Sequence, residues 1–179
     1  MENENIKLIK PIKAYELEIF DFKKEMLENN DVLHGASYLE NYDSFEEWEK
    51  VFDSYKDRNN LSGDFVEGSQ WLLVDLSKKR LLGMFNIRHY LNKDLLSTGG
   101  HVGYSIRPNE RGKGYAKLGL IEAVKFLNSM GEADILVTCD LDNLASKRVI
   151  IACGGVLENI VYSDKYKCEV ERYWIRKKD

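Results

Sequence analysis

The residues best suited to chemistry lie in a glycine-punctuated turn, Arg-Gly-Lys-Gly-Tyr-Ala, at positions 111–116. A predicted helix follows directly, and the uncovered N–H groups and the dipole of a helix N-terminus attract anions. Arg111 and Lys113 add two positive charges at the same place. A solvated helix start would explain the charges alone, but the two glycines favour a site for a phosphate or pyrophosphate.

Two common phosphate-binding motifs do not fit this turn. A P-loop requires Gly-x-x-x-x-Gly-Lys-Ser/Thr, but position 107 is Arg and position 114 is Gly. A dinucleotide fingerprint requires a third glycine where Lys117 stands. That fingerprint also opens a βαβ unit, whereas this turn follows a predicted antiparallel hairpin. The sequence therefore indicates a phosphate-bearing ligand of another class.

The elements that must position the turn are predicted from hydrophobic periodicity and from capping and turn residues. Helices are expected at about 15–28, at 44–55 with Ser44 as N-cap, at 113–129, and from Asp142 or Asn143 to 153. Strands are expected at 6–9, 70–76, 81–91, 99–107, 134–139, 156–162 and 167–176. This order predicts an α/β layered domain with a mixed sheet.

The composition narrows the class of protein further. A chain of 179 residues, 44% of them hydrophobic, is expected to form one domain over residues 1–179. The formal net charge of −4 argues against nucleic acid as a partner and weakly favours a cationic one, such as an amine. No apolar run approaches the roughly 20 residues that cross a bilayer. No signal peptide is visible either, so we expect a cytoplasmic protein with no membrane partner.

Cysteine and histidine usage adds two expectations. Cys139, Cys153 and Cys168 form no Cys-x-x-Cys pair, which is typical of packing cysteines in a reducing compartment. His34 and His89 show no metal-ligand spacing with other residues, so no metal is expected.

The turn and its surroundings resemble the GNAT superfamily of N-acetyltransferases. Residues 111–116 match the acyl-CoA signature Arg/Gln-x-x-Gly-x-Gly/Ala, and the strand before them ends in Gly-Tyr-Ser-Ile-Arg-Pro at 103–108. An apolar strand and an Asn-initiated helix follow at 137–146, and the helix ends at Gly154-Gly155. The combination is similar to a bacterial branch of predicted acetyltransferases. This resemblance implies a mostly antiparallel central sheet of about seven strands with helices on both faces, as in acyl-CoA N-acyltransferases.

The resemblance also implies an activity. A primary amine of a small molecule or peptide would attack the thioester of acetyl-CoA directly, and acetyl-CoA would be the co-substrate. The pyrophosphate would lie on the backbone of residues 111–116, and the pantetheine arm would lie along the preceding strand and reach Asn143. The implied cofactor-binding residues are Ser105, Ile106, Arg107, Arg111, Gly112, Lys113, Gly114, Tyr115, Ala116 and Asn143. The superfamily often forms homodimers, although the sequence itself does not fix the oligomeric state.

The catalytic residues are not given by the resemblance. Many members place a tyrosine, the general acid, seven residues after the asparagine, but here that position is Ile150. A non-catalytic acyl-CoA sensor or interaction module is therefore the alternative function. Three other residues are candidates. His101 would be a base or a hydrogen-bonded strand residue, Tyr104 an acid or a core aromatic, and Asp140 an amine ligand or a turn cap.

The acceptor pocket is expected on the first two helices and their connection, residues 29–42. His34, Tyr38, Tyr42, Trp48 and Asp31 are the candidate lining residues, and core packing is the alternative for the aromatic ones. The sequence does not identify the acceptor.

Overall fold

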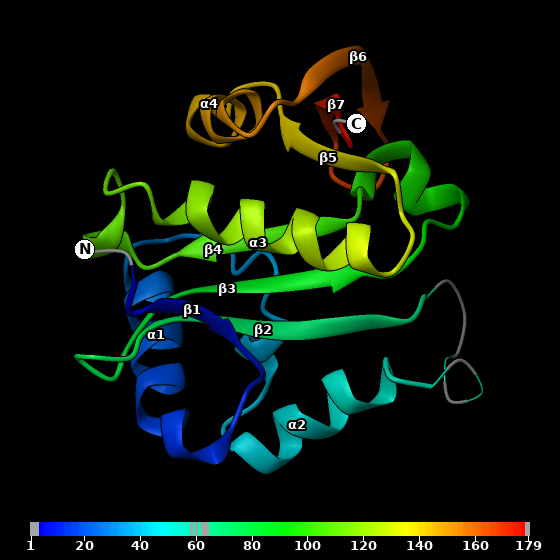
Figure 1. Ribbon diagram of the computed structural model, residues 1–179. Helices are drawn as coiled ribbons and strands as arrows, with labels where there is room; N and C mark the ends of the chain where they lie inside the picture. Colours follow the sequence, from blue (N-terminus) through cyan, green and yellow to red (C-terminus); the bar gives the residue numbers. More distant parts are fainter. Residues whose placement is uncertain (1–3, 58, 60, 62–64, 178–179) are drawn as a thin grey trace.

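The computed structural model describes residues 4–57, 59, 61 and 65–177, so both ends of the expected domain lie outside the described residues (Figure 1). The helices are α1 (Glu16–Glu28), α2 (Phe45–Ser54), α3 (Tyr115–Ser129) and α4 (Leu144–Ala152). The strands are β1 (Ile6–Ile9), β2 (Gly68–Asp75), β3 (Arg80–Arg88), β4 (Val102–Ile106), β5 (Asp134–Asp140), β6 (Val156–Ser163) and β7 (Cys168–Arg176). The predicted order of helices and strands is confirmed.

Helices cover both faces of the first sheet, as expected (Figure 1). On one face, α1 and α2 bury their apolar stripes against β2 and β3 through Ile19, Phe22, Met26, Phe45, Trp48, Phe52, Leu72 and Met84. On the other face, α3 buries Leu120, Ala123 and Leu127 against Phe85 and Ile87 of β3. Because side chains alternate along a strand, β3 supplies apolar side chains to both layers.

The strands form two sheets rather than one continuous sheet. The first has the order β1-β2-β3-β4 and the second the order β5-β7-β6, and every paired strand in the two sheets is antiparallel. β4 and β5 form no ladder in the part of the chain that the structure describes. They are joined just before β4, where the His101 N–H donates to the Leu136 carbonyl at 2.8 Å and the Leu136 N–H donates to the His101 ring. The expected mixed sheet of seven strands is therefore divided between β4 and β5.

The strand expected at 99–107 is shorter than predicted. A π-helical turn occupies Leu95–Gly99, and Gly100 follows with φ at +66°. A Cβ at Gly100 would lie 2.8 Å from the Leu136 carbonyl oxygen, so the chain can approach β5 there because the residue is glycine. The close approach at Gly100 fixes the point from which β4 and β5 diverge.

The connection between α1 and α2 is anchored to the first sheet by polar side chains. Ser37 donates to the Gln70 side chain at 2.6 Å and accepts from Asn86 at 3.2 Å. Gln70 in turn donates to the Gly35 carbonyl at 2.9 Å. Ser105 of β4 donates to the His34 carbonyl at 2.7 Å. This connection is therefore held against β2, β3 and β4.

No helix among the described residues combines the length and the apolar character that a membrane span requires.

Candidate active site

The turn at 107–116 connects β4 to α3 and leaves its backbone open. A short 3-10 turn at Pro108–Glu110 is followed by Gly112 at φ +74° and Gly114 at φ +85°, where Gly114 is the N-cap of α3. A Cβ at either glycine would meet nothing within 4 Å. Among the described residues, the amides of 112–114 donate no backbone hydrogen bond outside the regular elements. The N-terminus of a helix of 15 residues therefore faces open space.

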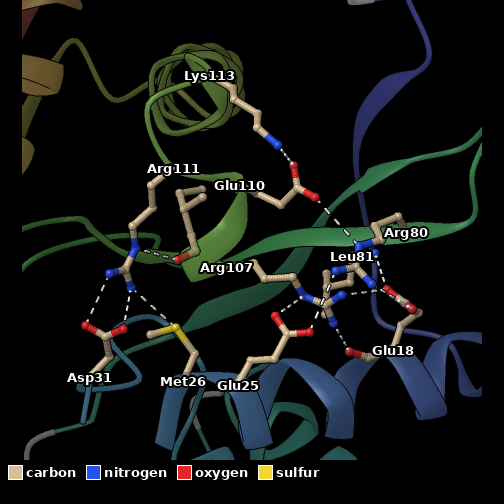
Figure 2. A network of polar contacts seen from close by, with 11 residues as sticks. Glu18, Glu25, Met26, Asp31, Arg80, Leu81, Arg107, Glu110, Arg111 and Lys113 are labelled. Carbon is tan, nitrogen blue, oxygen red and sulfur yellow. Dashed lines mark hydrogen bonds and ion pairs between the residues drawn. The ribbon is translucent and has the colours of Figure 1, made fainter. Parts of the chain in front are cut away.

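Both charged side chains of this turn are held by carboxylates (Figure 2). Arg111 pairs with Asp31 at 2.7 Å and donates through Nε to the Ile106 carbonyl at 3.1 Å. Burial acts to raise the pKa of Asp31, but hydrogen bonds from Arg111 and Asn29 outweigh it and lower the pKa. Lys113 pairs with Glu110 at 2.8 Å. The backbone amides of the turn, more than its two side chains, are thus the groups left free for an anion.

Arg107 lies beneath the turn, completely buried on the face that α1 covers (Figure 2). Its guanidinium lies 3.3 Å from a Glu18 carboxylate oxygen and 3.4 Å from one of Glu25, and it donates to the Glu18 carbonyl at 3.0 Å. Arg80 joins the same two carboxylates to Glu110. The Arg107 N–H donates to the Leu82 carbonyl of β3. Arg107 was expected to line the cofactor, but its contacts instead hold β4 and the turn to α1.

One edge of β4 is left open. The Arg107 N–H and the His101 carbonyl both bond to β3. In an antiparallel pair, alternate residues direct their backbone polar groups to the same side. Residues 103 and 105 therefore point their backbone groups at β3, and Val102, Tyr104 and Ile106 point theirs away from it, toward the side where β5 diverges. The open edge thus differs from the expected set: Ile106 belongs to it, whereas Ser105 and Arg107 face β3.

A cavity lies between the diverging strands β4 and β5. Its walls come from β4, β5, the start of α4, the connection at His34 and Gly35, and Tyr166 in the turn between β6 and β7. Three of the expected residues, Tyr104, Asp140 and Asn143, line this cavity, and His101 does not. An open helix N-terminus, a strand edge and a cavity therefore follow one another along this side of the molecule.

This arrangement has counterparts among known proteins. Residues 8–156 match the family described as the acetyltransferase (GNAT) domain. The chain belongs to the GNAT acetyltransferase family. No curated protein matches the sequence significantly. The family match covers the turn, the open edge of β4 and the cavity lining as far as Ser146, and it confirms the resemblance noted from the sequence.

Solved structures share the fold of this acetyltransferase at low sequence identity. Ribosomal-protein-S5-alanine acetyltransferase from Vibrio fischeri has a TM-score of 0.71 and 16% identity, over 100% of this chain and 97% of that chain. Spermidine N-acetyltransferase from Vibrio cholerae, in complex with CoA and spermine, has a TM-score of 0.67 and 18% identity, covering 97% of this chain and 96% of that chain. The microcin C7 self-immunity acetyltransferase, bound to acetyl-CoA and AMP, has a TM-score of 0.71 and 15% identity, over 98% and 94%. At sequence identities this low, the likeness shows a shared fold and nothing more.

In this acetyltransferase, His101 joins the two sheets. Its side chain is buried, and Nδ1 accepts the Leu136 N–H at 3.0 Å, which assigns the proton of the neutral ring to Nε2. Burial lowers the pKa of His101 to about 4, so the imidazole is neutral near pH 7. Its ring therefore serves as a hydrogen-bond acceptor between β4 and β5. This geometry favours the structural alternative over the base expected from the sequence.

Tyr104 projects from β4 toward the start of α4. Its ring stacks on Phe85 with centroids 5.4 Å apart, and its hydroxyl lies 2.8 Å from the Ser146 hydroxyl. Burial raises the pKa of Tyr104 to about 12. Asn143 caps α4, because its Oδ1 accepts the Ser146 N–H at 3.0 Å. Ile150, at the usual tyrosine position, is a fully buried core residue, and Tyr104 brings a phenol to the start of the same helix.

Asp140 is the one carboxylate on the described wall of the cavity. It lies at the end of β5, where the Cys168 thiol donates to it at 3.5 Å. Burial raises the pKa of the neighbouring Cys139 thiol to about 11, which leaves it unreactive near neutral pH. All three cysteines are free, as expected for packing residues. In the described part of the chain, no cluster of three or more potential ligands is arranged to hold a metal.

The residues expected in the acceptor pocket divide into two groups. His34 lines the cavity, whereas Tyr38 is not among its lining residues and makes an edge contact with the ring of Phe65. Trp48 is instead a fully buried core residue whose indole N–H donates to the Ala36 carbonyl. Asp31 is held by Arg111, and Tyr42 packs against the core beneath α1 and α2.

Sequence reasoning missed Arg88, which also lines the cavity. It lies at the end of β3, where its N–H donates to the His101 carbonyl at 2.8 Å. A single arginine after an apolar strand is a common feature of soluble proteins. Nothing in the sequence distinguishes it from a solvated strand end, because its neighbours in space come from segments distant along the chain.

Proposed function

We propose that this chain transfers the acetyl group of acetyl-CoA to a primary amine of a small molecule or peptide. The observation that carries the proposal is the continuity of the open α3 N-terminus, the open edge of β4 and the cavity. These features supply, in order, a place for a pyrophosphate, a partner for an amide-bearing arm and a space for two reacting groups.

The donor would be held mainly by backbone. The amides of residues 111–116 would bind the pyrophosphate, since Gly112 and Gly114 leave their surface uncovered. The polar backbone groups of Val102 and Tyr104 and the N–H of Ile106 would pair with the pantetheine arm as a further strand does, whereas the Ile106 carbonyl already accepts from Arg111. Asn143 would reach the same arm through its side-chain amide nitrogen, because its oxygen caps α4. A backbone N–H of β4 would polarise the thioester carbonyl.

In the transfer step, the amine nitrogen would attack the carbonyl carbon, the C–S bond would break, and CoA would leave as a thiolate. The Tyr104 hydroxyl would donate a hydrogen bond to that thiolate, because its raised pKa keeps it protonated. Asp140 would bind the acceptor ammonium, which loses one proton to solvent to become the attacking amine, and would take the second proton that the nitrogen releases as the amide forms. Both side chains line the same cavity. His101 has no part in this scheme.

The direct test is release of free CoA thiol from acetyl-CoA in the presence of a panel of primary amines. Turnover of any amine, with the acetylated amine identified by mass, would support the proposal. No turnover above background hydrolysis would contradict it. Calorimetric CoA binding without turnover would instead favour the acyl-CoA sensor, for which Ile150 in place of the usual tyrosine is the supporting observation.

A further inference from the structure

One cation on the cavity wall has no carboxylate within ion-pair distance in the described part of the chain. Among the described residues, Arg80, Arg107, Arg111 and Arg172 each lie within ion-pair distance of at least one carboxylate. Arg88 makes no such pair within that part of the chain, although it lies on the wall of the cavity. In a protein with a net charge of −4, an arginine kept away from carboxylates in a cavity is unusual.

The surroundings of Arg88 leave its guanidinium only weakly satisfied. Nη1 lies 3.5 Å from the carbonyl oxygens of Gly99 and Gly100, which is the long limit of a hydrogen bond. Desolvation lowers the pKa of Arg88, and the opposing electrostatic contributions come from the phenols of Tyr38, Tyr55 and Tyr166 rather than from an acid. An arginine remains protonated under these conditions, so the cavity wall carries a full positive charge.

Glycine at position 103 makes room for this guanidinium, and glycine at position 35 allows its own segment to approach Gly103 closely. A Cβ at Gly103 of β4 would lie 3.3 Å from both Nη atoms, and a Cβ at Gly35 would lie 2.1 Å from the Gly103 carbonyl oxygen. Gly35, Gly103 and Arg88 all line the cavity. Both Nη atoms of the guanidinium therefore lie close to Gly103 of β4, the strand on whose edge the thioester is proposed to lie.

A desolvated guanidinium with weak hydrogen bonds gains most from a planar or multivalent oxyanion, which accepts two N–H groups at once. On the basis of the proposed acetyl transfer, we infer that Arg88 binds an oxyanion, a carboxylate or a phosphate, that the amine acceptor itself carries. The acceptor is then an amine with an anionic group rather than a purely cationic polyamine.

The position of Asp140 sets the orientation of such an acceptor. Asp140 at the end of β5 attracts the ammonium group, and Arg88 at the end of β3 attracts the oxyanion. An acceptor with both charges is bound across the gap, with its nitrogen at the β5 side. A polyamine would satisfy Asp140 and leave a further positive charge near Arg88, which is repulsive at the short distances of a cavity.

Matched amines test the inference. 2-Phenylethylamine is compared with phenylalanine, which adds a carboxylate, and ethanolamine is compared with O-phosphoethanolamine, which adds a phosphate. We expect the anionic member of at least one pair to have a kcat/KM roughly 10- to 100-fold above its neutral partner. The pair that responds distinguishes a carboxylate from a phosphate. Spermidine is included as the purely cationic acceptor.

Variants then assign the effect to Arg88. Arg88→Met should abolish the preference by raising the acceptor KM while the acetyl-CoA KM stays unchanged, and Arg88→Lys should restore part of it. Arg176→Met removes one exposed positive charge at the end of β7 and is the matched control, with the preference retained. Melting curves of each variant with and without CoA verify that the fold and the donor site are intact.

Three outcomes would overturn the inference. These are a neutral amine or spermidine used as well as the anionic amines, a preference that Arg88→Met leaves unchanged, and an equal loss in Arg176→Met. If no amine is acetylated, the proposed function fails, and binding decides the inference separately. CoA-saturated protein is then titrated calorimetrically with the same amines, and binding of an anionic member must be lost in Arg88→Met.

Discussion

At the scale of single residues, the phenol of Tyr104 is the group best placed to meet a departing thiolate. Its position on β4 differs from the usual position on the helix after β5, which Ile150 occupies with a buried side chain. The raised pKa keeps the phenol protonated at neutral pH, so in the proposed reaction Tyr104 would support the leaving group as a hydrogen-bond donor and not act as a base.

Tyr104→Phe should therefore lower kcat by about 10- to 100-fold, the worth of one hydrogen bond to a charged group, with little change in the acetyl-CoA KM. Steady-state thiol release measures both constants. Ser146→Ala is the companion variant, because it keeps the phenol and removes its hydroxyl partner at 2.8 Å. Unchanged kcat in Tyr104→Phe would assign the residue to packing on Phe85.

His101 gives a prediction about stability rather than rate. Its pKa in the folded state, about 4, lies below the value near 6.5 of an unfolded chain. The unfolded state therefore takes up the proton first as pH falls. Above about pH 6.5 the neutral ring makes its full contribution to stability. As the pH falls from about 6.5 to about 4, this group lowers the free energy of unfolding by about 3 kcal/mol in total.

The matched variant is His101→Asn, whose side-chain oxygen can still accept from Leu136 but does not titrate. Denaturant unfolding at pH 7 and pH 4.5 should show a smaller loss of stability on acidification in His101→Asn than in the natural protein. The variant should also keep the pH dependence of kcat. Loss of a limb of that pH profile near neutrality would instead identify His101 as the base.

At this scale the sequence predicted part of the site. Tyr104, Asp140 and Asn143 were expected near the gap, and all three line the cavity. Their positions could be predicted because turn and capping residues mark the ends of strands and helices in the sequence. The burial of His101 depends on the contact between residues 101 and 136, which no local pattern encodes. For the same reason Arg88 could not be distinguished from a solvated arginine.

At the scale of elements, the turn and α3 depend on how closely that helix approaches β3. A Cβ at Gly119 would lie 2.1 Å from the ring of Phe85, so α3 packs at its present depth because this residue has no side chain. Phe85 in turn stacks on Tyr104. The depth of α3 therefore positions both the open helix N-terminus and the phenol.

Gly114→Val should raise the acetyl-CoA KM by roughly 10-fold or more, because a branched side chain would cover the amides at the N-cap. Gly131→Val is a close control. Gly131 has φ at +102° and open space around it, so the backbone strain is similar, but it follows the opposite end of α3. Both variants should lose comparable stability by thermal melting, and an equal KM in both would place the pyrophosphate elsewhere.

The helices and most strands were predicted to within a few residues, since their apolar stripes and the caps at Ser44 and Asn143 are local signals. The start of β4 was not. Residues 95–99 form a π-helical turn that ends where Gly100 closely approaches β5, and this approach is a tertiary contact that no local pattern encodes.

At the scale of the whole molecule, the two sheets converge at His101 and separate toward the turn. The open edge of β4 exists because β5 does not pair with it. The sequence indicated seven strands and their order, but the division into sheets of four and three follows from long-range packing. The acceptor side depends even more on distant contacts, since segments near residues 35, 88, 103, 140 and 166 meet there.

CoA is proposed to contact both sheets, so its binding should stabilise the folded protein as a whole. At a CoA concentration one hundred times Kd, the gain is about 2.7 kcal/mol. For a chain of this size, that corresponds to a rise in Tm of roughly 5–10 °C. ATP and NAD at the same concentration should give a much smaller rise. A larger shift with either nucleotide would contradict the assignment of the turn to CoA.

The buried Arg107 has a consequence for how this protein can change over evolutionary time. Two carboxylates and one main-chain carbonyl of α1 surround the buried charge of Arg107, which directly follows β4, so neither α1 nor β4 can shift without leaving that charge unpaired. These contacts therefore fix the position of β4 and of the turn that follows it relative to α1. The stretch between Asn29 and α2 can change in sequence without disturbing the turn or β4 only if it keeps Asp31, which holds Arg111, its buried apolar residues, and its polar anchors to Gln70, Asn86 and Ser105.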